Sequence, residues 1–194
     1  MNLARVLAQG KTPRALGFDD APFAKRPGAA VPLVGVLCSG TRFEGMLWGR
    51  TRRDGWGATE AIARMFEGSK FRDQAHAVLL DGIAVGGFNV VDLPALHARV
   101  GVPCAAVMRR APDLAAVHRA IGRLPQPARR LAVLAKAGAV HELGGHVFQV
   151  AGAVPAVMAA ALTALTREGA VPEALRLAHL IGSAVMLGES GRRA

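Results

Sequence analysis

Short apolar runs with strand character alternate with longer segments of helical spacing along this chain, and that alternation limits the choice of fold more than any other feature. The strand candidates are residues 14–18, 31–38, 43–52, 77–80, 103–108, 139–142 and 146–150. The helix candidates are residues 59–66, 90–100, 114–124, 127–137, 154–167 and 172–187. A hairpin followed by strand–helix–strand units is typical of a mixed sheet with helices on both faces. The sequence therefore predicts one α/β domain over residues 1–194.

Length and cysteine content indicate a protein that folds without disulfide bonds or a structural metal ion. The 194 residues suffice to bury a sizeable core. Cys38 and Cys104 lie in apolar runs, where cysteine behaves as a small core residue. No apolar run of about 18 residues is free of charges or breaks, and residues 1–11 lack the apolar stretch of a secretory signal. We therefore expect a cytoplasmic protein.

The charge balance favours a polyanionic partner. The chain has 24 Lys and Arg residues against 14 Asp and Glu residues, a formal net charge of +10. Excess positive charge promotes nucleic-acid binding, because contacts with phosphates release condensed counterions. The alternative is a basic bias shared by many proteins of an organism whose proteins are rich in Ala, Arg and Gly.

Acidic residues follow two of the predicted strands directly. Asp19 and Asp20 end the first strand, and Asp81 ends the strand at 77–80. Ligands of α/β sheets gather beyond the carboxyl ends of strands, and Mg²⁺ prefers oxygen ligands. Glu60, at the start of a helix, is a third candidate ligand. Spacing alone favours the alternative, in which these residues serve ordinary turns.

Two further polar segments are candidates for substrate contacts. Gly86 to Asn89 lie between a strand and a helix, where glycine permits close approach of a phosphate, although Asn89 or Asp92 alternatively caps that helix. The segment lacks a full dinucleotide or P-loop pattern, so no nucleotide cofactor is expected. Arg176, His179 and Ser183 share one helix face, which meets either the carboxylates or a phosphate, or else is an edge where Arg176 pairs with Glu173.

Four segments together resemble the endonuclease dU family, also known as DUF99 or UPF0215. They are GFDDAPF at 17–23, DGIAVGGFNVVD at 81–92, RRAPD at 109–113 and PEALRLAHLIGSAVMLGES at 172–190. That family is similar to endonuclease V, a repair nuclease with an RNase H-like fold. The resemblance implies an RNase H-like mixed sheet and a Mg²⁺- or Mn²⁺-dependent endonuclease. It also implies a role in DNA repair on DNA with deaminated bases, chiefly deoxyuridine but also inosine.

The resemblance assigns roles to particular residues. Asp19, with Asp20 as its rival, matches the first-strand aspartate of endonuclease V, and Asp81-Gly82 matches its second aspartate. Glu60 stands 21 residues before Asp81, the spacing of the endonuclease V glutamate. His179 stands where endonuclease V has an aspartate. The resemblance thus implies a catalytic set of Asp19, Glu60, Asp81 and His179.

The expected nucleic-acid contacts follow from the same resemblance and from the charge. The proposed set is Gly86, Gly87, Asn89, Arg110 and Arg176, with Arg52, Arg53 and Lys70 as further phosphate ligands. A damaged base is expected near residues 86–89, since such bases are commonly extruded from the stack.

Four departures from the two families leave alternatives open. Gly57 replaces an acidic residue of the family pattern, and His179 replaces an aspartate. The histidine that follows Asp-Gly in endonuclease V has no counterpart here, because Gly86-Gly87-Phe88 occupies that region, and the strand-parting aromatic motif of endonuclease V is not evident. The alternatives are a nucleic-acid-binding protein without nuclease activity, and a nuclease that acts on RNA.

Overall fold

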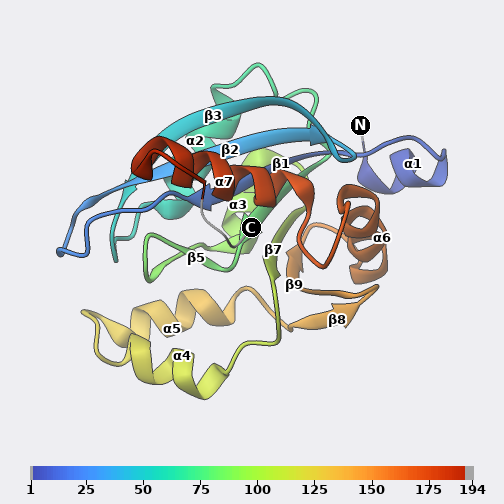
Figure 1. Cartoon of the computed structure of the whole chain (residues 1–194). Helices are drawn as coiled ribbons and strands as arrows, with labels where there is room; N and C mark the ends of the chain where they lie inside the picture. The colour runs from blue at the N-terminus through green and yellow to red at the C-terminus, as the bar shows by residue number, and fades with distance from the viewer. Residues whose placement is uncertain (1, 191–194) are drawn as a thin grey trace.

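A seven-stranded mixed sheet forms the centre of the protein in the computed structural model, which describes residues 2–190 (Figure 1). In spatial order the strands are β3 (Arg42–Arg52), β2 (Ala30–Ser39), β1 (Arg14–Asp20), β4 (Ala77–Asp81), β7 (Cys104–Met108), β9 (His146–Ala151) and β8 (His141–Leu143). The three central strands are parallel, and the outer strands add antiparallel hairpins. The predicted mixed sheet is confirmed.

Helices cover both faces of this sheet, as the strand–helix alternation predicts. The helices are α1 (Leu3–Ala8), α2 (Ala58–Glu67), α3 (Leu93–Val100), α4 (Leu114–Ile121), α5 (Pro127–Ala135), α6 (Pro155–Leu165) and α7 (Glu173–Leu187). In Figure 1, α7 crosses in front of β1 and β2, α2 and α3 lie behind the sheet, and α4 and α5 form a separate pair below. None of the helices within residues 2–190 combines the length and apolarity needed to cross a membrane.

The period-two alternation of the strands sorts their side chains between the two helical layers. Leu16 and Phe18 of β1 are buried in the cluster that contains the apolar face of α2. Ala15 lies in the opposite cluster with α6 and Leu175 of α7. By the same alternation, Asp19 lies on the α7 face of the sheet and Asp20 on the α2 face.

Glycines let α7 approach the sheet closely. A Cβ on Gly17 would lie 2.9 Å from the backbone carbon of Ala174, and one on Gly182 would lie 2.9 Å from the Ala21 Cβ. Both positions therefore exclude larger residues. This close packing holds the middle of α7 above the end of β1.

The helix starts show where sequence reasoning was accurate and where it was not. The Asp113 carboxylate accepts the Ala116 N–H and caps α4, as predicted. Asp92 caps α3 in the same way, so that helix begins at Leu93 rather than at residue 90. Residues 89–90 instead form β6 (Asn89–Val90), which pairs with β5 (Ala84–Val85). The short helix α1 was not expected.

Candidate metal centre

The end of β1, the end of β4 and the middle of α7 bring three metal-ligating side chains together. Phe18 pairs with Leu80 across the parallel strands, so the next residues, Asp19 and Asp81, lie side by side. His179 reaches them from α7. One ligand atom from each of the three lies within 4.8 Å of the others. Within residues 2–190 this is the single grouping of at least three such side chains.

Hydrogen bonds fix the Asp19 carboxylate between its neighbours. Asp19 Oδ2 and His179 Nδ1 share a hydrogen bond of 3.0 Å. Asp19 Oδ1 accepts the Asp20 backbone N–H at 2.8 Å. The guanidinium of Arg109 lies 4.0 Å from Asp81 Oδ2. Asp19 is 6% exposed, whereas His179 and Asp81 are partly open to solvent.

Burial and like charge raise the pKa values of the carboxyl groups. Burial is the main cause at Asp19, and repulsion from Asp81 and Asp20 adds to it; together they raise its pKa to about 7 despite the hydrogen bond from His179. Burial also raises the pKa of Asp81, which Arg109 and His179 offset only in part. The cluster therefore gathers negative charge that its own cations do not balance.

This donor set fits a divalent cation. The two carboxylates provide the oxygen ligands that Mg²⁺ and Mn²⁺ bind alongside water, and the imidazole adds a nitrogen ligand of the kind that transition metals accept. A cation here would relieve the repulsion that raises the pKa of Asp19. The residues that could hold it are Asp19, Asp81 and His179.

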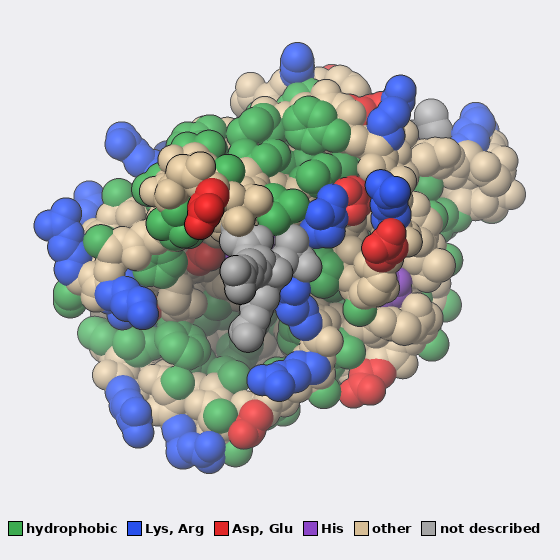
Figure 2. Space-filling model, viewed as in Figure 1, with side chains coloured by type: hydrophobic (Ala, Val, Ile, Leu, Met, Phe, Trp, Pro, Cys, Tyr) green, Lys and Arg blue, Asp and Glu red, His purple; other side chains and the backbone are tan. Residues whose placement is uncertain are grey.

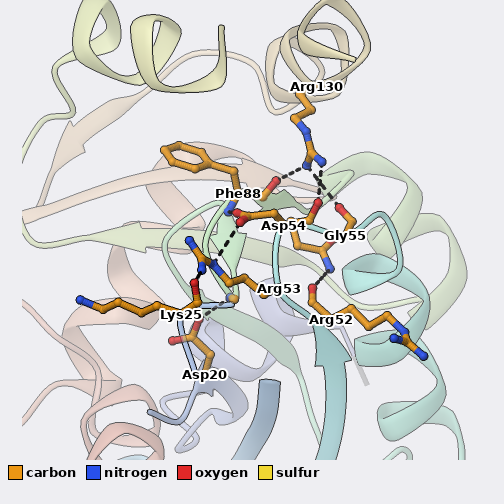
Figure 3. Close-up of polar contacts among 10 residues, drawn as sticks. Asp20, Lys25, Arg52, Arg53, Asp54, Gly55, Phe88 and Arg130 are labelled. Carbon is orange, nitrogen blue, oxygen red and sulfur yellow. Dashed lines mark hydrogen bonds and ion pairs between the residues drawn. The ribbon is translucent and has the colours of Figure 1, made fainter. Parts of the chain in front are cut away.

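Asp20, the rival of Asp19, points to the other face of the sheet. Its carboxylate accepts the backbone N–H of Gly86, which anchors the loop between β5 and β6 (Figure 3). Burial, the largest cause, raises the pKa of Asp20 as well. The structure thus separates the two aspartates: Asp19 joins the cluster, and Asp20 fastens a loop beside it.

Glu60 does not join this cluster, contrary to the sequence-based expectation. Its carboxylate lies on the outer side of α2, where it pairs with Arg64 at 3.2 Å and with Arg99 of α3. The side chain is 47% exposed. The spacing to Asp81 fits a ligand, but the helix turns this residue outward, toward the arginines. As folded, Glu60 is engaged elsewhere.

Two residues of the segment 86–89, Gly86 and Asn89, are buried and engaged in hydrogen bonds within the protein. Asn89 is fully buried; its side chain donates to Thr51 Oγ1 and the Arg52 carbonyl and accepts the Ala58 N–H. Gly86 is buried and its N–H is already used by Asp20. Gly87 is exposed, beside the Asp54 carboxylate. Gly86 and Asn89 thus serve the packing of this loop, and a damaged base near residues 86–89 stays a prediction.

Arg130 is a structural residue that sequence reasoning missed. It is 2% exposed, and its guanidinium donates to the carbonyls of Asp54, Gly55 and Phe88 (Figure 3). It also lies 4.4 Å from the ring centre of Trp56. In the sequence it is one of several arginine pairs, and nothing marks it as buried.

The remaining predicted contact residues have mixed environments. Arg176 pairs with Glu173 at 2.5 Å, one of the two alternatives, whereas His179 on the same helix meets the carboxylates, which was the other. Arg53 pairs with Asp54, and Lys70 lies over the Phe71 ring. Arg110 is exposed beside Arg109. Gly57 precedes α2, and a Cβ there would meet nothing within 4 Å.

Sequence comparison decides the family. A profile described as endonuclease dU matches residues 11–186. The chain belongs to the endonuclease dU family. Its relatives include a UPF0215 protein of Deinococcus radiodurans, 41% identical over 91% of this chain and 90% of that protein. A UPF0215 protein of Methanothermobacter thermautotrophicus is 39% identical over 91% of this chain and 89% of its own length.

Solved structures extend the likeness of this endonuclease dU family member to endonuclease V. A protein of unknown function from Archaeoglobus fulgidus superposes with a TM-score of 0.83 at 34% identity, over 89% of this chain and 98% of that one. Bacillus subtilis endonuclease V gives 0.56 at 10% identity, over 89% and 80%. Ciona intestinalis endonuclease V, in complex with DNA containing an inosine, gives 0.53 at 14%, over 87% and 84%. The RNase H-like nuclease fold is thereby confirmed.

Proposed function

We propose that this protein is a divalent-metal-dependent endonuclease that cleaves DNA containing deaminated bases, with deoxyuridine as the expected lesion, as a step in DNA repair. The observation that carries the proposal is the cluster of Asp19, Asp81 and His179 at the ends of two parallel strands. Membership of the endonuclease dU family and the endonuclease V fold support it. The net charge of +10 suits a phosphate-rich substrate.

The residues of the cluster have distinct roles in this proposal. Asp19, Asp81 and His179 would hold Mg²⁺ or Mn²⁺, which supplies an activated water and charge stabilisation at the phosphate. The hydrogen bond between Asp19 and His179 orients both ligands before any ion binds. Arg109, 4.0 Å from Asp81, brings a positive charge to the rim of the site, where a phosphate would approach.

The test is cleavage of oligonucleotides that differ only in one base. Duplexes and single strands with one uracil, one inosine or no lesion are incubated with Mg²⁺ or Mn²⁺. The proposal expects nicking of the lesion-containing strands, lost in Asp19→Asn and Asp81→Asn. Asp73→Asn is the matched control, because the Asp73 side chain is 94% exposed. Cleavage that survives both cluster substitutions contradicts the assignment of the site.

A nucleic-acid-binding protein without nuclease activity is the second candidate. One observation favours it: Glu60 is held by arginines, so the cluster has two carboxylates and an imidazole in place of three carboxylates. In that case, oligonucleotides bind with strong salt dependence, and no cleavage occurs with any divalent metal. Parallel ribo-oligonucleotides in the same assay decide between DNA and RNA as substrate.

A further inference from the structure

A groove beside the end of β3 has the chemistry of a nucleic-acid backbone site. It has a volume of about 510 Å³ and lies between the last residues of β3 and the first turns of α2. Arg50, Arg52, Arg64 and Trp56 line it. A second hollow, which Trp48 lines, shares Arg50 and Ala30 with it, so the two are continuous along the edge strand.

The charge of this groove is largely unbalanced. Arg50 and Arg52 are exposed, and neither forms an ion pair with any residue between 2 and 190. In Figure 3 the Arg52 guanidinium extends away from the surrounding polar contacts. Among residues 2–190, Arg64 forms an ion pair only with Glu60, on its own helix. Two guanidinium groups are thus free to bind an anion.

The start of α2 adds to this positive character. Gly57 is the cap residue of α2 and provides no side-chain hydrogen bond, and it lines the groove. The amino end of a helix carries partial positive charge. A Cβ at Gly57 would meet nothing within 4 Å, so the floor of the groove is open at this point.

Trp56 gives the groove an aromatic wall that is held in place. The side chain is 37% exposed, and the guanidinium groups of Arg129 and Arg130 lie 4.3 and 4.4 Å from its ring centre. Arg130 also holds the backbone of the loop through the Asp54 and Gly55 carbonyls (Figure 3). The guanidinium groups over the ring occupy the place where a base would stack, so Trp56 contributes a fixed, partly exposed wall beside the free arginines.

The groove lies at the same end of the sheet as the carboxylates. Asp19 pairs with Val34, and Val34 pairs with Trp48, so β3 is two strands from β1, about 10 Å at the usual strand spacing. β3 ends at this end of the sheet, as β1 and β4 do. Figure 2 shows Lys and Arg side chains gathered at the left edge of the view, where the β1–β2 connection lies.

We infer that this arginine groove, lined by Arg50, Arg52, Arg64 and Trp56, binds the phosphate backbone of a single nucleic-acid strand a few nucleotides from the metal centre. Arg50 and Arg52 lie two and four residues beyond Trp48, about 7 and 13 Å further along β3, so the groove is more than 10 Å from Asp19. The inference rests on the proposed function for the choice of nucleic acid as the ligand.

The first test measures the affinity of the full-length protein for a fluorescein-labelled single-stranded oligodeoxynucleotide in EDTA, as a function of salt. Arg50→Gln/Arg52→Gln is compared with Arg5→Gln/Lys11→Gln, which removes the same charge from exposed sites at the other end of the molecule. The groove variant is expected to bind at least about tenfold more weakly at moderate salt, with the slope of log K against log salt reduced by about 1.4. Equal affinity and slope in the two variants would overturn the inference.

A second pair of variants, which differ only in charge, tests whether the groove binds an anion. Gly57→Asp places a carboxylate on its floor, and Gly57→Asn is the neutral control of the same shape. Both side chains are favourable helix caps, so both variants should fold. We expect only the aspartate to weaken binding, by at least about threefold, the effect of one like charge at surface distances. Equal binding by the two variants contradicts a phosphate in this groove.

Trp56 provides a direct optical reporter. The chain has two tryptophans, so Trp48→Phe leaves Trp56 as the single source of tryptophan fluorescence. Oligonucleotide should quench this emission, and adding Arg50→Gln/Arg52→Gln should abolish the quenching at the same concentration. Emission that is unchanged at saturating oligonucleotide contradicts the inference.

The outcomes separate the groove from the proposed function. If wild-type protein cleaves DNA and the groove variant binds and cleaves equally well, the inference fails and the proposed function stands. If wild-type protein binds through the groove but cleaves nothing with either metal, the inference stands and the nuclease proposal fails.

Discussion

The replacement Asp19→Asn should stabilise the metal-free protein at alkaline pH, because burial of the charged Asp19 carboxylate destabilises the folded state. Asp19 is 6% exposed, and burial together with Asp81 and Asp20 raises its pKa from 3.8 to about 7. Between these two values the folded state binds a proton that the unfolded state has released. The free energy of unfolding therefore falls as the pH rises through this window.

The size of the effect follows from the two pKa values. The rise in the pKa of Asp19 from 3.8 to about 7 lowers the free energy of unfolding above pH 7 by about 4 kcal/mol at most, at about 1.4 kcal/mol per pH unit. Asparagine has no charge to bury, but it loses part of the hydrogen bond with His179 at 3.0 Å. We expect a net gain of about 2–3 kcal/mol at pH 8, a rise in Tm of about 4–12 °C, and little difference near pH 4.

Thermal unfolding of EDTA-treated protein between pH 4 and pH 8 measures this directly. Asp73→Asn, at an exposed site, is the control and should follow wild type. In the same experiment, Mn²⁺ at a hundred times its Kd should raise the free energy of unfolding of wild type by about 2.7 kcal/mol, and so raise its Tm, but should leave the Tm of Asp19→Asn almost unchanged. If Asp19→Asn is no more stable than wild type at pH 8, or gains as much from Mn²⁺, the electrostatic reasoning is refuted.

Three further substitutions test the packing and the boundaries of the site. Gly17→Ala places a Cβ 2.9 Å from the backbone of Ala174 and should lower the free energy of unfolding by about 1–3 kcal/mol in chemical denaturation. Arg130→Lys keeps the positive charge but loses the planar guanidinium group that donates to the Asp54, Gly55 and Phe88 carbonyls. It should lower the free energy of unfolding by about 2–4 kcal/mol in the same assay, and a decrease below about 1 kcal/mol would contradict this structural role of Arg130. Glu60→Gln loses exposed ion pairs worth at most about 1 kcal/mol and should leave metal affinity by calorimetry unchanged, whereas a large loss of affinity would restore Glu60 as a ligand.

The sheet could be predicted from the sequence because its signals are local. Apolar runs, turn residues between them and helical spacing located all seven strands of the main sheet and six of the seven described helices. The short helix α1 was missed, since six residues give too little periodicity. The start of α3 was misplaced because the apolar pair Val90-Val91 reads equally well as helix or strand.

The candidate site was only partly predictable, because it depends on the direction of individual side chains. Asp19 and Asp81 could be predicted because each lies at the end of a strand. The choice of Asp19 over Asp20 requires knowing which alternate residues of β1 face α7. Glu60 has the expected spacing, yet the partners that hold it, Arg64 and Arg99, are set by the packing of α2 against α3. Arg130 shows the same limit, since only tertiary structure distinguishes it from its exposed neighbour Arg129.

Anomalous scattering from a crystal soaked with Mn²⁺ would show directly whether the ends of β1 and β4 hold a metal ion, because it locates the ion independently of activity. We expect one or two manganese peaks with Asp19, Asp81 and His179 among their ligands, and loss of those peaks in Asp19→Asn. Manganese bound at Glu60 instead, or no peak at the end of β1 and β4 at a saturating concentration, would contradict a metal centre at this place.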